Sequence, residues 1–150
     1  MIDIRWTVQR FGELSSVDLY ALLGLRADVF VVEQNCIYRD IDGLDPAAVH
    51  VLGRHGDELI AYARILPPGA DGLPHIGRVV VHPDFRRQGL AGRLMERCLD
   101  ALAHHHGSRR SALSAQAHLV GFYARHGYVP QGSVYDLDGI PHVDMRRDAP

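Results

Sequence analysis

The sequence contains no lysine; all sixteen of its basic residues are arginines. A P-loop nucleotide-binding site is therefore excluded, because its G-x-x-x-x-G-K-[ST] motif uses a lysine to reach the phosphates. An enzyme of this sequence that modified amines would also find no lysine side chain of its own to modify.

The sequence also lacks a strong net charge and a long apolar run. Its formal net charge is −2, so we expect no general attraction to nucleic acid or to a membrane surface. No stretch of about eighteen apolar residues is present, which argues against a membrane span. The first residues have no apolar core of a secretory signal. We therefore expect a cytoplasmic protein with neither nucleic acid nor membrane as a partner.

Cysteine is scarce, with only Cys36 and Cys98 in 150 residues. The two lie far apart in the sequence, and in the cytosol both should be free thiols. Cys98 falls in an apolar helical pattern and is expected in the core. Cys36 lies in a polar loop, where a catalytic nucleophile is the alternative to an inert thiol.

The length predicts one domain, residues 1–150, with a core of its own. Apolar residues that alternate, or that recur every three to four positions, predict its elements. The expected strands cover 2–9, 48–54, 58–66, 75–82, 111–117, 128–137 and 139–147, and the expected helices cover 15–32, 89–106 and 118–127. This order predicts an α+β (mixed α/β) fold with helices on the faces of a central sheet. The helix between strands 75–82 and 111–117 predicts a parallel pair there.

The turn FRRQGLAG places two arginines and two glycines where a strand passes into a helix. The first amides of a helix have no partner within it, and the helix dipole is positive at that end. Glycine lets a ligand phosphate approach these amides closely, and Arg86 and Arg87 add positive charge. We expect an anion site here, with an ordinary solvated turn as the alternative. The amides that the turn would offer belong to Gln88, Gly89, Leu90, Ala91 and Gly92.

The spacing within this turn separates the phosphate motifs. A dinucleotide fingerprint needs G-x-G-x-x-G, and Gly89 and Gly92 have the wrong spacing for it. The segment Arg86–Ala91 matches [QR]-x-x-G-x-[GA] instead. A second motif follows about thirty residues later, the aromatic pair Phe122–Tyr123 closed by Gly127–Tyr128. In these two motifs and their order, the chain resembles the GCN5-related N-acetyltransferases (GNAT), whose first motif holds the pyrophosphate of acetyl coenzyme A.

Within that superfamily the chain is similar to the ElaA-like subfamily from end to end. The resembling segments are LRADVFVVEQNCIYRDIDGLD, AYARIL, IGRVVV, SAQAHLVGFY and GIPHVDM. The resemblance implies a GNAT fold with a mixed, mostly antiparallel central sheet and helices on both faces. In this fold two central parallel strands splay apart, and the pantetheine arm of the cofactor lies between them.

The resemblance also implies roles for individual residues. The backbone of Val79, Val80 and Val81 would receive the pantetheine as a sheet edge receives an added strand. An N–H of this strand would stabilise the oxyanion that forms on the thioester. Tyr123 matches the family's general acid, and a tyrosine near its reference pKa of about 10 is protonated at neutral pH.

Two further cofactor contacts are implied, from Phe122 and from Gln116. Many relatives carry Asn at the Gln116 position, seven residues before the signature tyrosine, so this chain departs from the family pattern there. The longer amide can reach for the same contact.

The general base stays open among several side chains. Glu33 and His118 are the first candidates, and Asp40, Asp42 and His142 are the others. Histidine has a reference pKa of about 6.5 and can accept a proton directly or through a water. The residue types alone do not choose among them.

The loop EQNCIYRDIDGLD is expected to cover the acceptor side of the site. Its acids would favour a cationic amine through their local field, and a plain solvated loop is the alternative. Expected substrate contacts are Glu33, Asp40, Asp42 and His142. The loop lacks the EF-hand spacing and its final Glu, so no metal is expected.

Taken with the resemblance, the residues imply an N-acetyltransferase. It would transfer the acetyl group of acetyl coenzyme A to a primary amine of a small-molecule or protein acceptor by direct attack. The alternatives are a coenzyme A-binding regulatory domain without turnover and an acyltransferase that uses another acyl donor. Small domains of this family often pair, so a homodimer is also compatible with the sequence.

Overall fold

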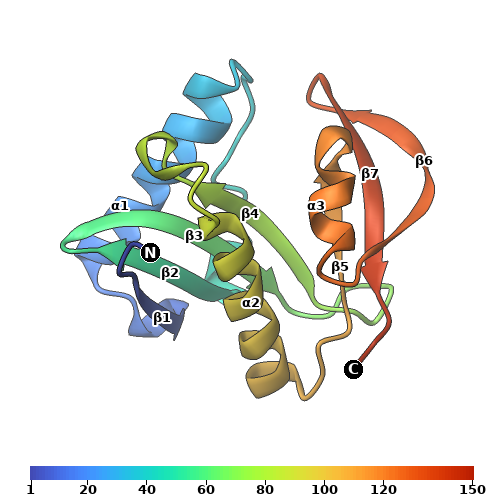
Figure 1. Cartoon of the computed structure of the whole chain (residues 1–150), viewed down its shortest axis with the longest axis horizontal. Helices are drawn as coiled ribbons and strands as arrows, with labels where there is room; N and C mark the ends of the chain where they lie inside the picture. The colour runs from blue at the N-terminus through green and yellow to red at the C-terminus, as the bar shows by residue number, and fades with distance from the viewer.

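The computed structural model describes residues 1–150, which form a seven-stranded sheet with helices against both faces (Figure 1). No helix combines the length and the apolar character needed to cross a bilayer. The strands are β1 (Arg5–Arg10), β2 (Val49–His55), β3 (Glu58–Leu66), β4 (His75–Val81), β5 (Ser111–Gln116), β6 (Val129–Leu137) and β7 (Ile140–Arg147). The helices are α1 (Ser16–Arg26), α2 (Leu90–His106) and α3 (Val120–Ala124), with a π-helix, Ala27–Glu33, directly after α1. Short 3₁₀ turns cover Phe11–Glu13, Asp45–Ala47, Pro83–Phe85 and Ala117–Leu119.

The sheet runs in the order β1-β2-β3-β4-β5-β7-β6, and only β4 and β5 are parallel neighbours. These two strands pair at one position, His75 with Ala112, and they diverge beyond it. The chain crosses from β4 to β5 through α2, which supplies the long connection that a parallel pair needs. The expected mixed, mostly antiparallel sheet with a splayed parallel pair is confirmed.

The helices divide the core between the two faces of the sheet. On one face, α1 places Leu22 and Leu25 against Tyr62 and Val80. On the other, α2 and α3 pack against side chains of β3, β5 and β7. Burying one aliphatic side chain fully contributes about 1.5–3 kcal/mol, so both layers contribute to the stability of the fold. The stripe expected on α2 is buried as predicted: Leu90, Leu94, Met95, Cys98, Leu99 and Leu102.

The first helix begins where the sequence indicates but changes geometry before its end. Ser15 Oγ accepts a hydrogen bond from Asp18 N at 3.0 Å, which satisfies one free amide of the first turn. The α-helix ends at Arg26, and the following turns are π-helical, with Gln34 N donating to Val29 O at 3.0 Å. Apolar spacing over two turns does not separate the two geometries, so the sequence predicted one uniform helix. π-Helical segments occur often at functional sites.

The last hairpin has the turn that its residues predict. Asp138 and Gly139 adopt φ of +52° and +82°, the left-handed pair that a two-residue type I′ turn requires. This turn carries the start of β7 to the mouth of the gap between β4 and β5 (Figure 1).

Candidate active site

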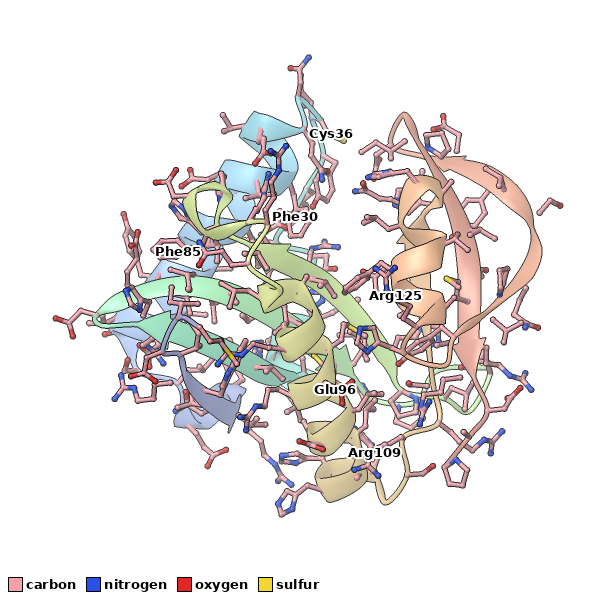
Figure 2. All side chains as sticks on the ribbon, in the orientation of Figure 1. Phe30, Cys36, Phe85, Glu96, Arg109 and Arg125 are labelled. Carbon is pink, nitrogen blue, oxygen red and sulfur yellow. The ribbon has the colours of Figure 1, made fainter.

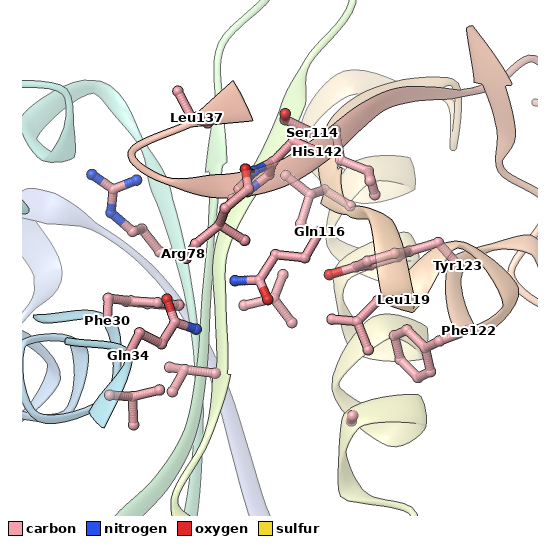
Figure 3. A pocket seen from close by; sticks show the side chains of 18 of the residues that line it. Phe30, Gln34, Arg78, Ser114, Gln116, Leu119, Phe122, Tyr123, Leu137 and His142 are labelled. Atoms are coloured by element: carbon pink, nitrogen blue, oxygen red, sulfur yellow. Dashed lines mark hydrogen bonds between the residues drawn. The ribbon is translucent and has the colours of Figure 1, made fainter. Parts of the chain in front are cut away.

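A cavity of about 830 Å³ opens where β4 and β5 diverge. Its lining comes from the π-helix, β4, β5, α3 and the β6–β7 hairpin. The cavity exists because the sheet is unpaired here: past His75, the edge of β4 that faces β5 has no strand against it. Figure 3 shows Phe30, Gln34 and Arg78 on one wall and Gln116, Leu119, Phe122, Tyr123 and His142 on the other.

The arginine–glycine turn has the backbone of an anion site. Arg87 and Gly89 adopt left-handed φ of +63° and +73°, and Gly89 is the residue before the first turn of α2. The first hydrogen bond of the helix runs from Arg93 N to Gly89 O at 3.3 Å. The amides of residues 88–92 donate to no other protein group, so they are free for an anion. The side chains of Arg86 and Ala91 reach the cavity, whereas Leu90 is buried in the core.

Arg86 and Glu33, two residues with separate expected roles, bind each other. Arg86 Nη1 and Nη2 donate to the two carboxylate oxygens of Glu33 at 2.5 and 2.8 Å, and Arg86 Nε donates to Val81 O at 3.1 Å. The hydrogen bonds from Arg86 lower the pKa of Glu33 below its usual value. The pair connects the π-helix to the arginine–glycine turn of residues 85–92, which we call the anion turn. The pairing also makes Glu33 a weaker proton acceptor than a free glutamate.

Tyr123 points its hydroxyl into the cavity beside Gln116 (Figure 3). Its side chain is buried, and burial, with smaller contributions from Cys98 and Tyr128, raises its pKa to about 12. The phenol is therefore fully protonated at neutral pH and available as a proton donor. Phe122 holds the ring edge-on, with the ring centroids 5.0 Å apart.

His142 stands on β7 directly opposite Gln116 in the sheet register and lines the same cavity. Its Nδ1 donates to the carbonyl of Ile140 at 2.7 Å. Since a carbonyl only accepts, the proton of the neutral ring lies on Nδ1, and Nε2 keeps its lone pair. The ring of Tyr135 stacks on the imidazole with centroids 6.3 Å apart, which limits how the imidazole can turn.

The aspartates of the acidic loop do not line the cavity, and of its acids only Glu33, at the start of the loop, does. Asp40 accepts from Arg26 Nε at 3.0 Å and from Arg78 Nε at 2.8 Å. Asp42 accepts from Arg64 through two hydrogen bonds, at 2.9 and 2.6 Å. Neither Asp40 nor Asp42 lines the cavity. The arginines that bind them offset their negative charge, so these two acids do not provide the field that was expected to favour a cationic acceptor.

Asp45 lies at the centre of the same network. It accepts from Arg26 Nη1 at 2.7 Å and from Arg64 Nη1 at 3.1 Å, and its side chain is only 6% exposed. Burial raises the pKa of Asp45, but the hydrogen bonds and charges of the two arginines outweigh burial and lower it overall. We name this set of three acids and three arginines the Asp–Arg cluster: Arg26, Asp40, Asp42, Asp45, Arg64 and Arg78.

The remaining sequence candidates divide between the cavity and the core. His118 lines the cavity from the 3₁₀ turn before α3. Cys36 is buried at the rim, and its thiol donates to Asp138 O at 3.3 Å across the mouth. Figure 2 shows Phe30 and Cys36 on the α1 side and Arg125 on the α3 side. Cys98 is fully buried in the core, as expected.

The sequence did not predict several polar residues of the lining, among them Gln34, Arg78 and Ser114. Two of them left a signal in the sequence. Ser114 alternates with Gln116 along β5 and must share its face. Arg78 is a charged residue inside an otherwise apolar strand, which is uncommon without a partner or a function. Gln34 left no such signal, because the direction of its side chain depends on the π-helix that precedes it.

A family model described as an acetyltransferase (GNAT) domain matches residues 17–149. Protein ElaA of Escherichia coli K12 is 47% identical over 148 residues, which are 97% of each chain. The chain belongs to the GNAT acetyltransferase family. Within this family it belongs to the ElaA-like group.

Solved GNAT structures agree with this assignment. An acyl-CoA N-acyltransferase from Pseudomonas aeruginosa superposes with a TM-score of 0.93 at 44% identity, covering 97% of this chain and 99% of that one. The crystal structure of E. coli ElaA gives a TM-score of 0.90 at 46% identity, covering 97% and 100%. An aminoglycoside 6'-N-acetyltransferase complexed with coenzyme A, only 17% identical, shares the fold with a TM-score of 0.69 over 94% and 96% of the two chains.

Membership in the GNAT family implies an acyl-CoA donor and an acceptor substrate. The cavity between β4 and β5 is where the fold leaves backbone and polar side chains available for both. Residues 1–150 contain no group of three or more His, Cys, Asp or Glu side chains placed to hold a metal ion.

Proposed function

We propose that this GNAT protein is an N-acetyltransferase that transfers the acetyl group of acetyl coenzyme A to a primary amine by direct attack. One observation carries the proposal: a protonated tyrosine, an imidazole with a free lone pair and an unpaired strand edge face one cavity. The free amides of the anion turn lie at the start of α2, on the same side of the sheet opening. A second cavity, beside Arg10 and His105, has only about 230 Å³.

The donor half of the site fits coenzyme A. The backbone amides of Gln88, Gly89, Leu90, Ala91 and Gly92 would bind the pyrophosphate, with Arg87 adding charge. The unpaired edge formed by Val79, Val80 and Val81 would bind the pantetheine. Phe122 and Gln116 lie beside this path and would contact the cofactor arm. Arg86 would act chiefly by holding Glu33 and the Val81 carbonyl.

The chemistry needs three groups from the protein. Acetyl coenzyme A supplies the thioester that the amine attacks and the thiolate that leaves. His142 Nε2 accepts the proton that makes the amine nucleophilic. A backbone N–H on the free edge of β4 stabilises the developing oxyanion, and Tyr123 donates its proton to the leaving sulfur.

We assign the base role to His142 over the other candidates on geometric grounds. Glu33 is held by Arg86, and its pKa is lowered. Asp40 and Asp42 are bound by arginines outside the cavity. His118 lines the cavity, but no hydrogen bond sets the tautomer of its ring, whereas Ile140 holds His142 in the form whose Nε2 accepts a proton.

Replacing His142 with glutamine should lower kcat/KM about 100-fold, within the range typical of a lost general base. The acid limb of the pH profile of kcat/KM, which reports protonation of the base in the free enzyme, should disappear as well. His118→Gln is the matched control and should keep both the rate, to within about threefold, and the acid limb. If His118→Gln removes the limb and His142→Gln does not, the assignment is reversed.

Replacing Gly89 with valine should weaken coenzyme A binding about tenfold. A β-branched residue at φ +73° costs roughly 1–2 kcal/mol in backbone strain, and its side chain would crowd a phosphate on the amides. A Cβ at this position meets no protein atom within 4 Å, so the fold itself should survive. Isothermal titration of coenzyme A measures the effect.

Gly24→Ala is the control for the loss of a glycine. This residue lies in α1 at a helical position with open space around it. The change should leave coenzyme A affinity unchanged and stabilise the protein by about 0.5–1 kcal/mol. Equal affinities for Gly89→Val and wild type would remove the anion turn from the donor site.

The function itself is tested by incubating the protein with acetyl coenzyme A and a panel of primary amines while thiol release is followed. Acetylation of at least one amine, identified by mass spectrometry, is the expected result. Tight coenzyme A binding without thiol release for any amine would favour a regulatory binding domain. Faster transfer from a longer acyl donor would favour the other acyltransferase, although Val79 and Phe122 line the path that a longer chain would follow.

A further inference from the structure

We propose that the acceptor is a small amino carboxylate, such as a free amino acid, and that Arg78 binds its carboxylate. This inference rests on the proposed acetyl transfer and names the class of acceptor. It replaces the cationic acceptor that the acidic loop suggested, because the aspartates of that loop are outside the cavity and Glu33, which lines it, is bound by Arg86.

The guanidinium of Arg78 is held by Asp40, and one of its nitrogens remains free to bind a ligand. Its Nε donates to Asp40 Oδ1 at 2.8 Å and its Nη2 to the Asp40 carbonyl at 3.0 Å. The ring of Tyr38 lies 5.4 Å from the guanidinium carbon. Nη1 donates to no protein group, and the side chain, 21% exposed, lines the cavity. A guanidinium fixed in this way can bind an anion with little further loss of side-chain freedom.

The backbone places Arg78 at this wall through a strained conformation. Tyr62 pairs with Val80 but Arg64 pairs with Gly77, so β4 has one extra residue opposite β3. Arg78 lies in this bulge with a left-handed φ of +51°, which is unfavourable for a residue with a Cβ. Bulges redirect side chains beside active sites, and this one directs a cation to the acceptor side.

The charges along the cavity favour an anion on this wall. Glu33, the first lining carboxylate, is bound by Arg86. Arg64, a second lining arginine, is nearly buried, and its Nε has no hydrogen-bond partner. The three aspartates of the Asp–Arg cluster do not line the cavity, whereas two of its arginines, Arg64 and Arg78, do. The cluster therefore presents positive charge to the cavity.

The opposite wall suits the amine. His142 lies across the cavity from Arg78 (Figure 3). Asp138, the other lining carboxylate, makes no ion pair with any arginine and lies at the mouth on the hairpin turn. An acceptor with an amine at the His142 side and a carboxylate at the Arg78 side would match both walls.

The test uses matched acceptors: free amino acids, the same compounds as carboxamides, and the corresponding decarboxylated amines. At saturating acetyl coenzyme A, wild type should favour the carboxylates by about tenfold or more in kcat/KM, as a site built for one polar group rejects analogues without it. Arg78→Gln should reduce that preference to about twofold, mainly by raising KM for the carboxylates, with rates on the amines little changed. A preference for amines without carboxylate, or an unchanged preference in Arg78→Gln, would overturn the inference.

Two controls keep the result interpretable. Arg78→Lys retains the charge beside Asp40 without the planar fork, and it should keep an intermediate preference. Arg109→Gln, an exposed arginine beyond the end of α2, should leave the preference unchanged. The thermal shift produced by coenzyme A reports that each variant is folded.

Failure of the proposed function is distinguishable from failure of this inference. If no amine is acetylated, titration of the coenzyme A complex with the same matched compounds still measures the carboxylate preference. Tighter binding of the free amino acids, lost in Arg78→Gln, supports the Arg78 site without turnover. Equal binding of acids and amides overturns it.

Discussion

Replacing Tyr123 with phenylalanine should lower kcat by about 10²–10⁴-fold, the range expected when a general acid is lost, while the Kd for coenzyme A stays within about twofold of wild type. The hydroxyl faces the cavity and makes no hydrogen bond to another protein group, so its removal breaks no contact of the fold. Steady-state rates and a coenzyme A titration separate the two effects.

Tyr128 is the matched control for Tyr123. It is also buried, its pKa is also raised to about 12 by burial, and its hydroxyl hydrogen-bonds Ser111 Oγ at 2.6 Å. Tyr128→Phe should cost about 1 kcal/mol of stability and leave kcat unchanged. If Tyr123→Phe behaves like Tyr128→Phe, with turnover retained, Tyr123 is not the acid.

The pH dependence gives a second check on Tyr123. Its pKa of about 12 means that the phenol stays protonated across the range in which the enzyme can be assayed. We therefore expect no fall in kcat below about pH 10 from loss of this proton. An alkaline limb centred well below that value, and absent in Tyr123→Phe, would contradict the raised pKa.

Replacing Asp45 with asparagine should lower the free energy of unfolding by about 3–5 kcal/mol, the usual cost of breaking a buried ion pair on one side. The change leaves Arg26, which is fully buried, and Arg64 facing a neutral group. Since a domain of this size has about 5–15 kcal/mol in total, urea unfolding should show a much earlier midpoint.

Asp148→Asn is the control, because its pairs with Arg146 and Arg110 are exposed and such pairs contribute about 0–1 kcal/mol. A loss below about 1 kcal/mol for Asp45→Asn would show that the Asp–Arg cluster does not stabilise the fold.

The same cluster predicts how stability responds to acid. The arginines lower the pKa of Asp45 in the folded state despite its burial, so its contribution is complete above the unfolded pKa of about 3.9 and is lost as the pH falls below it. Stability of wild type should therefore drop more steeply on acidification than that of Asp45→Asn.

Much of the fold could be predicted from the sequence because the signals are local. The apolar stripe from Leu90 to Leu102 indicated α2, and the Asp138–Gly139 pair indicated the last hairpin turn. The π-helix after Arg26 could not be predicted, because its hydrogen bonds depend on packing rather than on residue spacing.

The proposed donor half of the site could be located in the sequence for the same reason. The anion turn is one continuous segment, and its amides are free because a helix starts there. Tyr123 was placed by a short motif at the end of α3. The structure brings both to the β4–β5 opening that the order of elements already implied.

The acceptor half depends on contacts that no local pattern encodes. Glu33 and Arg86 are 53 residues apart in the sequence, and Arg78 and Asp40 are 38 apart. These two ion pairs nevertheless decide which charged groups are available in the cavity. The sequence alone determined the family, the layers and the anion turn, since backbone geometry follows neighbouring residues. Only the tertiary structure decided that the acids of the loop bind arginines and that Arg78 and His142 line one cavity, because Coulomb energy depends on distance in space.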